Sequence, residues 1–359
     1  MKVAVIGAGI SGLACAHELE RHGVIPDIFE QRSRCGELFT HCAVLLQIMH
    51  RPVRDIINDL HERFHITIKP INTLKKITMY ASGNSGSVYG NLGYFVELGQ
   101  APDSVANQIH SRIKTAVRYN TMADFSRLAR EYDYVVVASG DSNTAEILGC
   151  WEGVSNAWVM GATVLGSFDP SAMKMWVNTD YARQGYAYLT PFNSKSASLV
   201  LVVTGANRKN IGRFWNKFWQ VENLKYEISL LWDLQHVSGF VYPHRVGNIL
   251  LAGNSGGVLE PFLGFAMYSS IKSGIYAARS IVEGNSYEEY LEQIKENVRV
   301  SIALRNTIDK YRNEDFGRLV KFLTTPGIKQ IIYNTNLDML KIAASLLGIK
   351  SKLELLKEK

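Results

Sequence analysis

The sequence predicts an α/β fold with a parallel sheet built around a glycine-rich turn, a second, mainly antiparallel sheet, and C-terminal helices. Three observations carry this prediction. The first 30 residues run from an apolar strand through a glycine turn and a helix to a second strand. Residues 66–98 and 156–244 contain short strand-like runs divided by turn residues. Residues 286–359 have helical spacing of their apolar side chains.

The glycine turn is the most informative element. It follows the apolar run Lys2–Ile6, precedes a helix predicted for Leu13–Arg21, and contains Gly7, Gly9 and Gly12. In a dinucleotide-binding turn, the first glycine permits the tight bend, the second lets backbone approach a pyrophosphate, and the third lets helix and strand pack closely. Glu30 ends the second predicted strand, Ile25–Glu30, where an acid accepts hydrogen bonds from ribose hydroxyls. The segment therefore predicts a Rossmann-like dinucleotide site.

The composition is that of a globular protein. The chain has 359 residues, of which 47% are hydrophobic, and this length predicts about two domains. Lys2, the apolar run and Ala14-Cys15-Ala16 imitate a secretory signal, but they coincide with the glycine turn, so we expect no cleavage. No apolar run approaches the roughly 20 residues that span a bilayer. The cysteines show no metal-ligand spacing, so we expect no metal site and a reducing, cytoplasmic setting; they are Cys15, Cys35, Cys42 and Cys150.

The net charge of +6 limits the partners. No basic run is interleaved with aromatic residues, which argues against nucleic acid. Residues 318–359 contain eight Lys or Arg and three Asp or Glu, a net charge of +5, with apolar side chains between them. This tail is expected either to pack as ordinary helices or to contact the anionic inner face of a membrane as a peripheral segment.

The elements between these landmarks are assigned by spacing and turn residues. Residues 32–50 are expected to form a loop along the cofactor, and residues 53–64 a helix. Asp103 is expected to cap a helix that runs to about Lys114. Strands are expected at 116–119, 132–138 and 248–253. Long helices are expected at 211–221, where the aromatic stripe favours packing over ligand binding, and from Phe262 to Ile281.

These assignments give a discontinuous organisation. We expect residues 1–65, 100–155 and 245–285 to form the dinucleotide-binding domain. Residues 66–99 and 156–244 would form a substrate domain with an antiparallel sheet. Residues 286–359 would form a C-terminal helical segment. No second glycine motif occurs, so no separate nicotinamide-binding domain is expected.

The order of motifs resembles a known superfamily. The opening glycine motif, the strand at 132–140 (YDYVVVASG) and the late segment at 252–257 (AGNSGG) are similar to the FAD-binding proteins of the p-hydroxybenzoate hydroxylase-like superfamily. That resemblance implies a glutathione reductase-like, FAD-binding Rossmann domain. The residues matched to FAD-binding positions are Gly7, Gly9, Ile10, Ser11, Gly12, Glu30, Gln31, Arg32, Cys35, Gly36, Ser139, Gly140, Gly253, Asn254, Gly264 and Phe265.

Within the superfamily, the chain most resembles the geranylgeranyl reductase family. Tyr186–Pro191 (YAYLTP) matches that family's YxWxFP motif, with Tyr188 in place of Trp and Thr190 in place of Phe. The late segment matches the family's GDAAG motif, with Asn254 in place of Asp. The family's early cysteine resembles Cys35. The resemblance implies reduction of C=C bonds in an isoprenoid chain, free or lipid-linked, with electrons from a nicotinamide or ferredoxin-type donor.

The resemblance also implies roles for individual residues. Pro261–Gly264, at the predicted start of the late helix, would direct a helix N-terminus at the flavin C2=O. Tyr186, Tyr188 and Thr190 share one strand face and would line an apolar slot. Cys35, Tyr186 and Tyr188 are the candidate catalytic residues, and the candidate proton donors are Cys35, His41, Cys42 and Tyr186. Two alternatives stay open: an FAD-dependent monooxygenase or halogenase of a small apolar substrate, and a non-catalytic FAD-holding electron-transfer protein.

Overall fold

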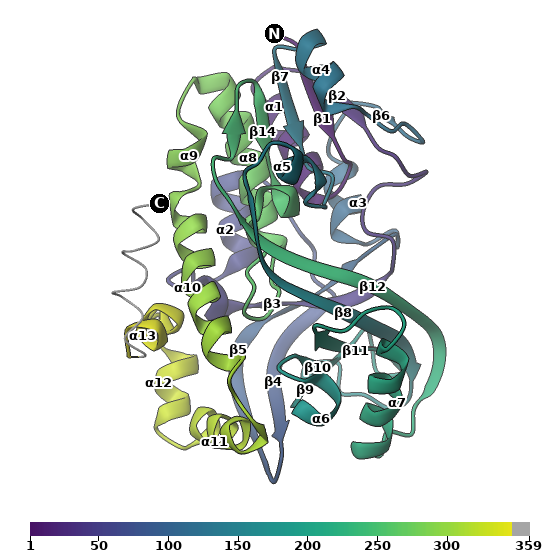
Figure 1. Ribbon diagram of the computed structural model, residues 1–359, viewed down its shortest axis with the longest axis vertical. Helices are drawn as coiled ribbons and strands as arrows, with labels where there is room; N and C mark the ends of the chain where they lie inside the picture. The colour runs from purple at the N-terminus through teal and green to yellow at the C-terminus, as the bar shows by residue number, and fades with distance from the viewer. Residues whose placement is uncertain (347–359) are drawn as a thin grey trace.

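The computed structural model describes residues 1–346 and contains two sheets with different partners (Figure 1). The first sheet lies at the end of the molecule where Figure 1 marks the N-terminus. Its strand order is β13-β14-β7-β1-β2-β6. Its strands pair in parallel except for β13 with β14. The bounds are β1 (Val3–Ile6), β2 (Asp27–Phe29), β6 (Val117–Arg118), β7 (Tyr134–Val137), β13 (Arg245–Val246) and β14 (Ile249–Leu251).

Helices α1 (Ile10–Arg21) and α8 (Met267–Glu283) pack against each other beside this sheet. Their backbones approach closely at Gly274, where an added Cβ would lie 2.1 Å from the Ser11 carbonyl oxygen. Short helices complete this part of the molecule: α2 (Ile56–Phe64), α3 (Val105–His110), α4 (Phe125–Glu131) and α5 (Asn143–Ile147). The buried apolar side chains of α1, α2 and α8 form one core with β1.

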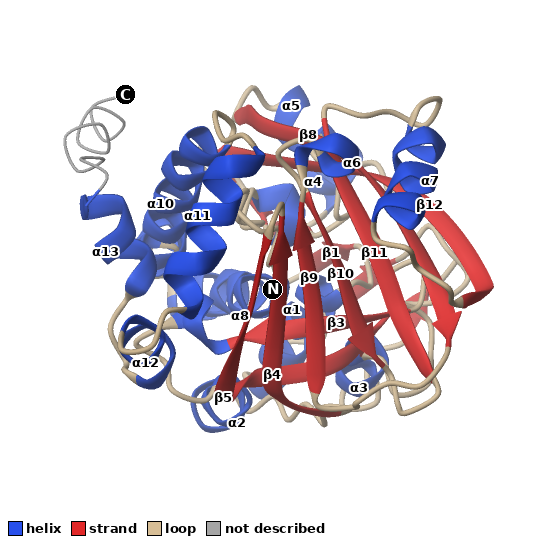
Figure 2. Cartoon of the chain, turned by 90° about the horizontal axis from the view of Figure 1, so that it is seen from below, coloured by secondary structure: helices blue, strands red, loops and turns tan. Residues whose placement is uncertain are grey.

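The second sheet has the order β12-β8-β11-β10-β9-β4-β5-β3 (Figure 2). It is antiparallel except for the parallel pair β4 and β9. Its bounds are β3 (His41–Leu46), β4 (Asn72–Ala81), β5 (Asn84–Leu98), β8 (Trp151–Leu165), β9 (Ala172–Val177), β10 (Tyr186–Pro191), β11 (Ser196–Thr204) and β12 (Glu227–Val241). Helix α7 (Ile211–Val221) covers β8 and β11, and its aromatic residues Phe214, Trp215 and Phe218 are buried there. The expectation that this stripe packs is confirmed.

The chain passes between the sheets repeatedly. It leaves the first sheet after β2, returns after β5, leaves again after β7 and returns after β12. The expected mixture of a parallel nucleotide-binding sheet and a mainly antiparallel second sheet is therefore confirmed.

The C-terminal helices run along one side of the molecule (Figure 1). They are α9 (Tyr287–Tyr290), α10 (Glu292–Ile308), α11 (Asn313–Thr324), α12 (Ile328–Asn334) and α13 (Met339–Leu346), and the remaining short elements are α6 (Thr179–Ala182), η1 (Gln47–His50) and η2 (Gly253–Gly256). Helix α11 packs on β5 and β4, and α13 packs on α10. No helix among residues 1–346 is both long and apolar enough to cross a bilayer. Part of the predicted membrane-facing tail, including Leu347, Leu353 and Leu356, lies outside the described residues.

Three local expectations were wrong. Residues 41–46 are strand β3 rather than loop, because they pair with β5 at the edge of the second sheet. Ser104 caps α3 in place of Asp103, with its hydroxyl accepting from the Asn107 N–H. Helix α8 begins at Met267 rather than Phe262, because residues 261–266 form a turn held by a side chain described below.

Candidate functional site

The glycine turn has the geometry of a dinucleotide site. Gly7 has φ +102°, and an added Cβ would lie 2.3 Å from the Ala138 carbonyl oxygen, so no other residue fits. A Cβ on Gly12 would lie 2.0 Å from the Gly7 carbonyl oxygen. A Cβ on Gly9 would meet no protein atom within 4 Å. Gly7 and Gly12 therefore serve the fold, whereas Gly9 leaves space in front of the helix.

Helix α1 begins directly at this space. Gly9 is its N-cap residue, and no side chain caps the helix. The N–H groups of the first turn, which includes Ile10 and Ser11, therefore point toward the open side of Gly9 and suit phosphate oxygens.

Glu30 joins the turn to the loop after β2. Its side chain is 7% exposed, and its carboxylate accepts from the Ala8 N–H at 2.8 Å and the Arg32 N–H at 2.9 Å. A carboxylate has further lone pairs, so it can still accept from ribose hydroxyls. Gln31 and Arg32 are exposed beside it, and Gly36 is buried, with its N–H donating to the Ala8 carbonyl.

The other predicted cofactor segments converge on the same end of the sheet. β7 and β14 are adjacent parallel strands, so Ser139–Gly140 and Gly253–Asn254 leave the sheet side by side. The Ser255 hydroxyl accepts from the Gly140 N–H at 3.0 Å and lies 3.1 Å from the Ser139 hydroxyl. The Ser273 hydroxyl accepts from the Gly253 N–H at 2.9 Å.

These serines were not predicted. Ser255 and Ser273 are fully buried, and their hydroxyls fix the two loops against each other and against α8. The sequence signal for Ser255 is its position in the late segment at 252–257, and the signal for Ser273 is its position among the small residues of the late helix.

Glu260 was also missed and controls the turn at 261–266. Its carboxylate accepts from the N–H groups of Phe262, Leu263 and Phe265 at 2.8, 3.0 and 2.9 Å, and its carbonyl accepts from the Gly264 N–H at 3.0 Å. The prediction that Pro261–Gly264 form a helix N-terminus with free N–H groups was therefore wrong. Burial raises the pKa of Glu260 to about 7, outweighing these N–H bonds. An acidic residue directly before a proline and a glycine is the sequence pattern that indicates a turn whose N–H groups are bound by that acid.

Strand β10 meets this turn. The Tyr186 hydroxyl donates to the Leu263 carbonyl, and the rings of Tyr186 and Tyr188 lie with centroids 5.9 Å apart. Gly264 lies beside both Tyr186 and His236 of β12, since its added Cβ would be 3.9 Å from the Tyr186 hydroxyl and 3.3 Å from His236 Cε1. Ala187 and Leu189 face the opposite core under α7, so the predicted alternation holds. Burial raises the pKa of both tyrosines and lowers that of His236, which keeps all three neutral.

The face that carries Tyr188 is aromatic. Tyr188 packs against two apolar clusters: Phe265 borders the first, and the second contains Trp232 and is bordered by Phe39. The rings of Phe39 and Trp232 stack with centroids 5.5 Å apart. Thr190 is fully buried, and its hydroxyl donates to the Cys42 carbonyl at 2.6 Å, so it offers no free polar group to a ligand. The expectation that Thr190 contributes to an open wall was wrong.

The cysteines differ from the tyrosines in their surroundings. Cys35 is buried in the core of the first domain, where its thiol donates to Asn107 Oδ1 at 3.0 Å and burial raises its pKa. Cys42 donates to the Pro191 carbonyl at 3.3 Å, and burial raises its pKa as well. Both are therefore held as thiols. His41 contacts Trp232, with ring centroids 5.8 Å apart.

Comparisons with known proteins agree with this geometry. The family described as "NAD(P)-binding Rossmann-like domain" matches residues 5–43, which span the glycine turn and Glu30. A comparison with curated protein sequences finds no significant match.

Solved structures share the whole fold at low identity. A geranylgeranyl bacteriochlorophyll reductase-like protein from Thermoplasma acidophilum superimposes with a TM-score of 0.72 at 16% identity, covering 96% of this chain and 98% of that one. A flavin-dependent brominase gives 0.65 at 13% identity, covering 98% and 100%. 2-Methyl-3-hydroxypyridine-5-carboxylic acid oxygenase gives 0.60 at 14% identity, covering 92% and 95%. The chain therefore shares its overall fold with these three proteins, one of which is a flavin-dependent enzyme.

Proposed function

We propose that this chain is an FAD-dependent oxidoreductase that reduces C=C bonds of an apolar, isoprenoid-type chain. The observation that carries the proposal is the contact between the tyrosine pair of β10 and the turn at 261–266, which follows the late cofactor segment. The similarity to a geranylgeranyl bacteriochlorophyll reductase-like structure supports the choice of substrate class.

The residues that would hold FAD follow from the geometry of the first domain. The N-terminus of α1 and the open side of Gly9 suit the pyrophosphate, and Glu30 suits the ribose. The segments at Ser139–Gly140 and Gly253–Asn254 border the same end of the sheet. When bound, FAD would supply a hydride to one carbon of the alkene.

The protein must then supply apolar surface and a proton. Tyr188, Phe265, Trp232 and Phe39 offer apolar area suited to a hydrocarbon chain. Reduction of an alkene also needs a proton at the second carbon. Tyr186 is the candidate donor, because its phenol stays protonated and lies beside Gly264. Cys35 is the less favoured donor, because it is buried in the core that α1, α2 and α8 form with β1.

The alternative is an oxygen-dependent reaction. The similarity to a brominase and to an oxygenase favours it, since both share the complete fold. Anaerobic reduction of the purified protein separates the two proposals. Reoxidation of the flavin by a prenyl alkene without oxygen supports the reductase, and substrate conversion only with oxygen supports a monooxygenase or halogenase. Absence of both reactions, with one protein co-purifying, supports an electron-transfer role. The electron donor would be a nicotinamide or a ferredoxin-type protein.

A further inference from the structure

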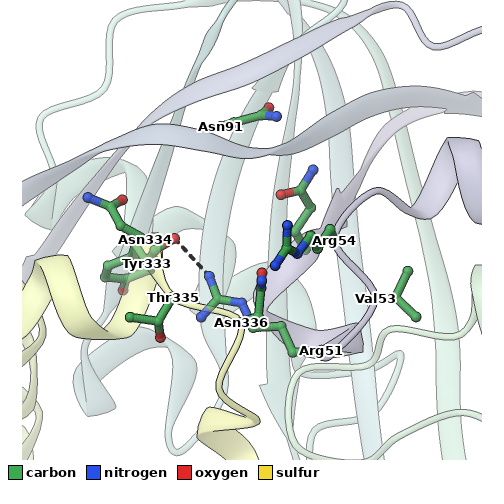
Figure 3. Close-up of a pocket in the computed structure, with 9 residues that line it drawn as sticks. Arg51, Val53, Arg54, Asn91, Tyr333, Asn334, Thr335 and Asn336 are labelled. Carbon is green, nitrogen blue, oxygen red and sulfur yellow. Dashed lines mark hydrogen bonds between the residues drawn. The ribbon is translucent and has the colours of Figure 1, made fainter.

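A polar cavity lies between η1 and the end of α12, beside β5 of the second sheet (Figure 3). Its volume is about 270 Å³, and it is lined by Arg51 and Arg54, by Asn91 of β5, and by residues 333–336 at the end of α12 and just after it. None of these residues belongs to the flavin or tyrosine sites described above. This volume lies just below the range of about 300–1,000 Å³ for small-molecule sites, so it suits a compact head group rather than a long chain.

Arg51 is fixed by the end of α12. Its Nη1 and Nη2 donate to the carbonyl oxygens of Ile332 and Tyr333 at 2.5 and 2.7 Å. These are carbonyls that a helix C-terminus leaves without partners, and a cation is favourable there. A guanidinium has five N–H groups, so Arg51 keeps donors for another acceptor. Burial lowers its pKa, which indicates a charge that is incompletely compensated.

Arg54 faces the same cavity and is more exposed. Asn336 is its neighbour: with the side-chain amide turned so that its oxygen faces Arg54, that oxygen lies 2.5 and 2.8 Å from Arg54 Nε and Nη2. A neutral amide does not balance the charge. Within residues 1–346, neither Arg51 nor Arg54 lies within 4.0 Å of a carboxylate oxygen. Two guanidinium groups therefore line one cavity without an acidic partner in the described part of the chain.

Gln47 supplies an independent observation. It lines the cavity and is 8% exposed, yet its Nε2 has no acceptor among the described residues. A buried donor without an acceptor is costly, and an acceptor group bound in the cavity would remove that cost. The side chains around the cavity thus offer many donors and no carboxylate.

We propose that this cavity binds a phosphoryl group, with the guanidinium groups of Arg51 and Arg54 and the amide of Gln47 as its donors. A phosphoryl group presents three or more acceptor oxygens, which matches the surplus of donors better than the two oxygens of a carboxylate. The group can come from a phospholipid head or from a soluble phosphorylated compound. The lipid source is favoured by exposed apolar side chains on the neighbouring segments, namely Phe322, Ile331 and Leu337. The proposal does not rest on the reductase activity.

Calorimetry on FAD-saturated protein tests whether the cavity binds a phosphoryl group, with inorganic phosphate and pyrophosphate as probes. FAD saturation keeps the probes out of the glycine turn. We expect one site per chain, weakened about tenfold or more in Arg54→Gln. Gln47→Leu should weaken the same site while leaving both arginines in place. Arg130→Gln removes one exposed charge on α4 and should leave binding unchanged.

Vesicle flotation distinguishes a phospholipid head from a soluble compound as the source of the phosphoryl group. Flotation of wild type with phosphatidic acid vesicles but not phosphatidylcholine vesicles, lost in Arg54→Gln, supports a phospholipid head. Calorimetric binding that depends on Arg54, without flotation, supports a soluble phosphorylated ligand. The proposal is overturned if wild type binds neither probe nor vesicle. It is also overturned if Arg54→Gln behaves as wild type, or if Arg130→Gln weakens binding equally. Circular dichroism and FAD absorbance verify that each variant is folded.

Discussion

The Tyr186 hydroxyl donates a hydrogen bond to the Leu263 carbonyl, and this contact joins the two sheets of the molecule at the candidate site. Tyr186 belongs to β10 of the second sheet, whereas Leu263 follows β14 of the first. The turn that carries Leu263 is held from within by Glu260. Any movement of that turn must therefore disturb both the tyrosine pair and the Glu260 carboxylate.

Replacing Gly9 tests the cofactor site without disturbing the fold. Gly9 has φ −81°, and an added Cβ meets no protein atom within 4 Å, so Gly9→Val should fold normally. Its side chain would occupy the space assigned to the pyrophosphate, so the purified protein should be colourless. The absorbance ratio at flavin and protein wavelengths measures this. Gly12→Val is the contrasting variant and should lose the fold as well, because its Cβ would overlap the Gly7 carbonyl. Full FAD content in Gly9→Val would contradict the assignment of the pyrophosphate to the open side of Gly9.

Glu30→Ala should weaken FAD binding by roughly ten- to a hundredfold, since charge-assisted bonds contribute about 1.5–3 kcal/mol. The same change removes the acceptor for the Ala8 and Arg32 N–H groups, so the apoprotein should also unfold at a lower temperature. FAD titration and thermal unfolding of apoprotein measure the two effects separately. An unchanged dissociation constant, even with lower stability, would show that the ribose binds elsewhere.

Tyr188→Ala should reduce turnover of a prenyl substrate at least about tenfold while FAD content stays constant, because the ring forms part of the proposed apolar wall. Tyr186→Phe should lower kcat with little effect on KM, because it removes the proposed proton and the bond to Leu263 alone. Tyr226→Ala is a suitable control, since Tyr226 packs in the α7 core on the other face of the sheet. Loss of FAD together with activity would indicate a structural role, and normal turnover in both variants would contradict the proposed substrate site.

Glu260 should make folding stability depend on pH. Its pKa rises from 4.5 to about 7 in the folded protein through burial, so the folded state holds the proton more tightly than the unfolded state. The contribution is fully present below pH 4.5 and is lost as pH rises to 7, with a total of at most about 3 kcal/mol. Denaturant unfolding of wild type and Glu260→Gln between pH 4.5 and 7.5 tests this. Wild type should lose stability relative to the variant as pH rises, and a constant difference would show that the carboxyl does not titrate there.

The strand–turn–helix unit of the first sheet could be predicted from sequence because the residues that specify it are close together in the chain. The requirement for glycine at positions 7 and 12 follows from contacts within one strand–turn–helix unit and with the neighbouring strand. That Tyr186 and Tyr188 lie on the same face of β10 could also be predicted, because side chains alternate between the two faces of a strand. Strand β3 was missed because its apolar residues pair with β5, which lies some 50 residues later, and no local feature specifies that partner.

The start of α8 was missed for a related reason. Phe262, Leu263 and Phe265 have ordinary helix-forming side chains, but the Glu260 carboxylate takes their N–H groups and holds a turn instead. Propensity gives no indication of such a contact, because it depends on how one buried acid is oriented. The cavity beside Arg51 was equally hidden, since it joins residues near position 50 to residues near position 335.

The repeated passage of the chain between the sheets constrains how the molecule can come apart. The first sheet draws its strands from three separate stretches, 3–29, 117–137 and 245–251, and the second from residues 41–98 and 151–241. A protease that cuts one loop between β3 and β12 therefore leaves the strands of both sheets divided between the two fragments. Nicked protein should remain associated until it is denatured, and heating should produce one calorimetric transition rather than a separate peak for each sheet.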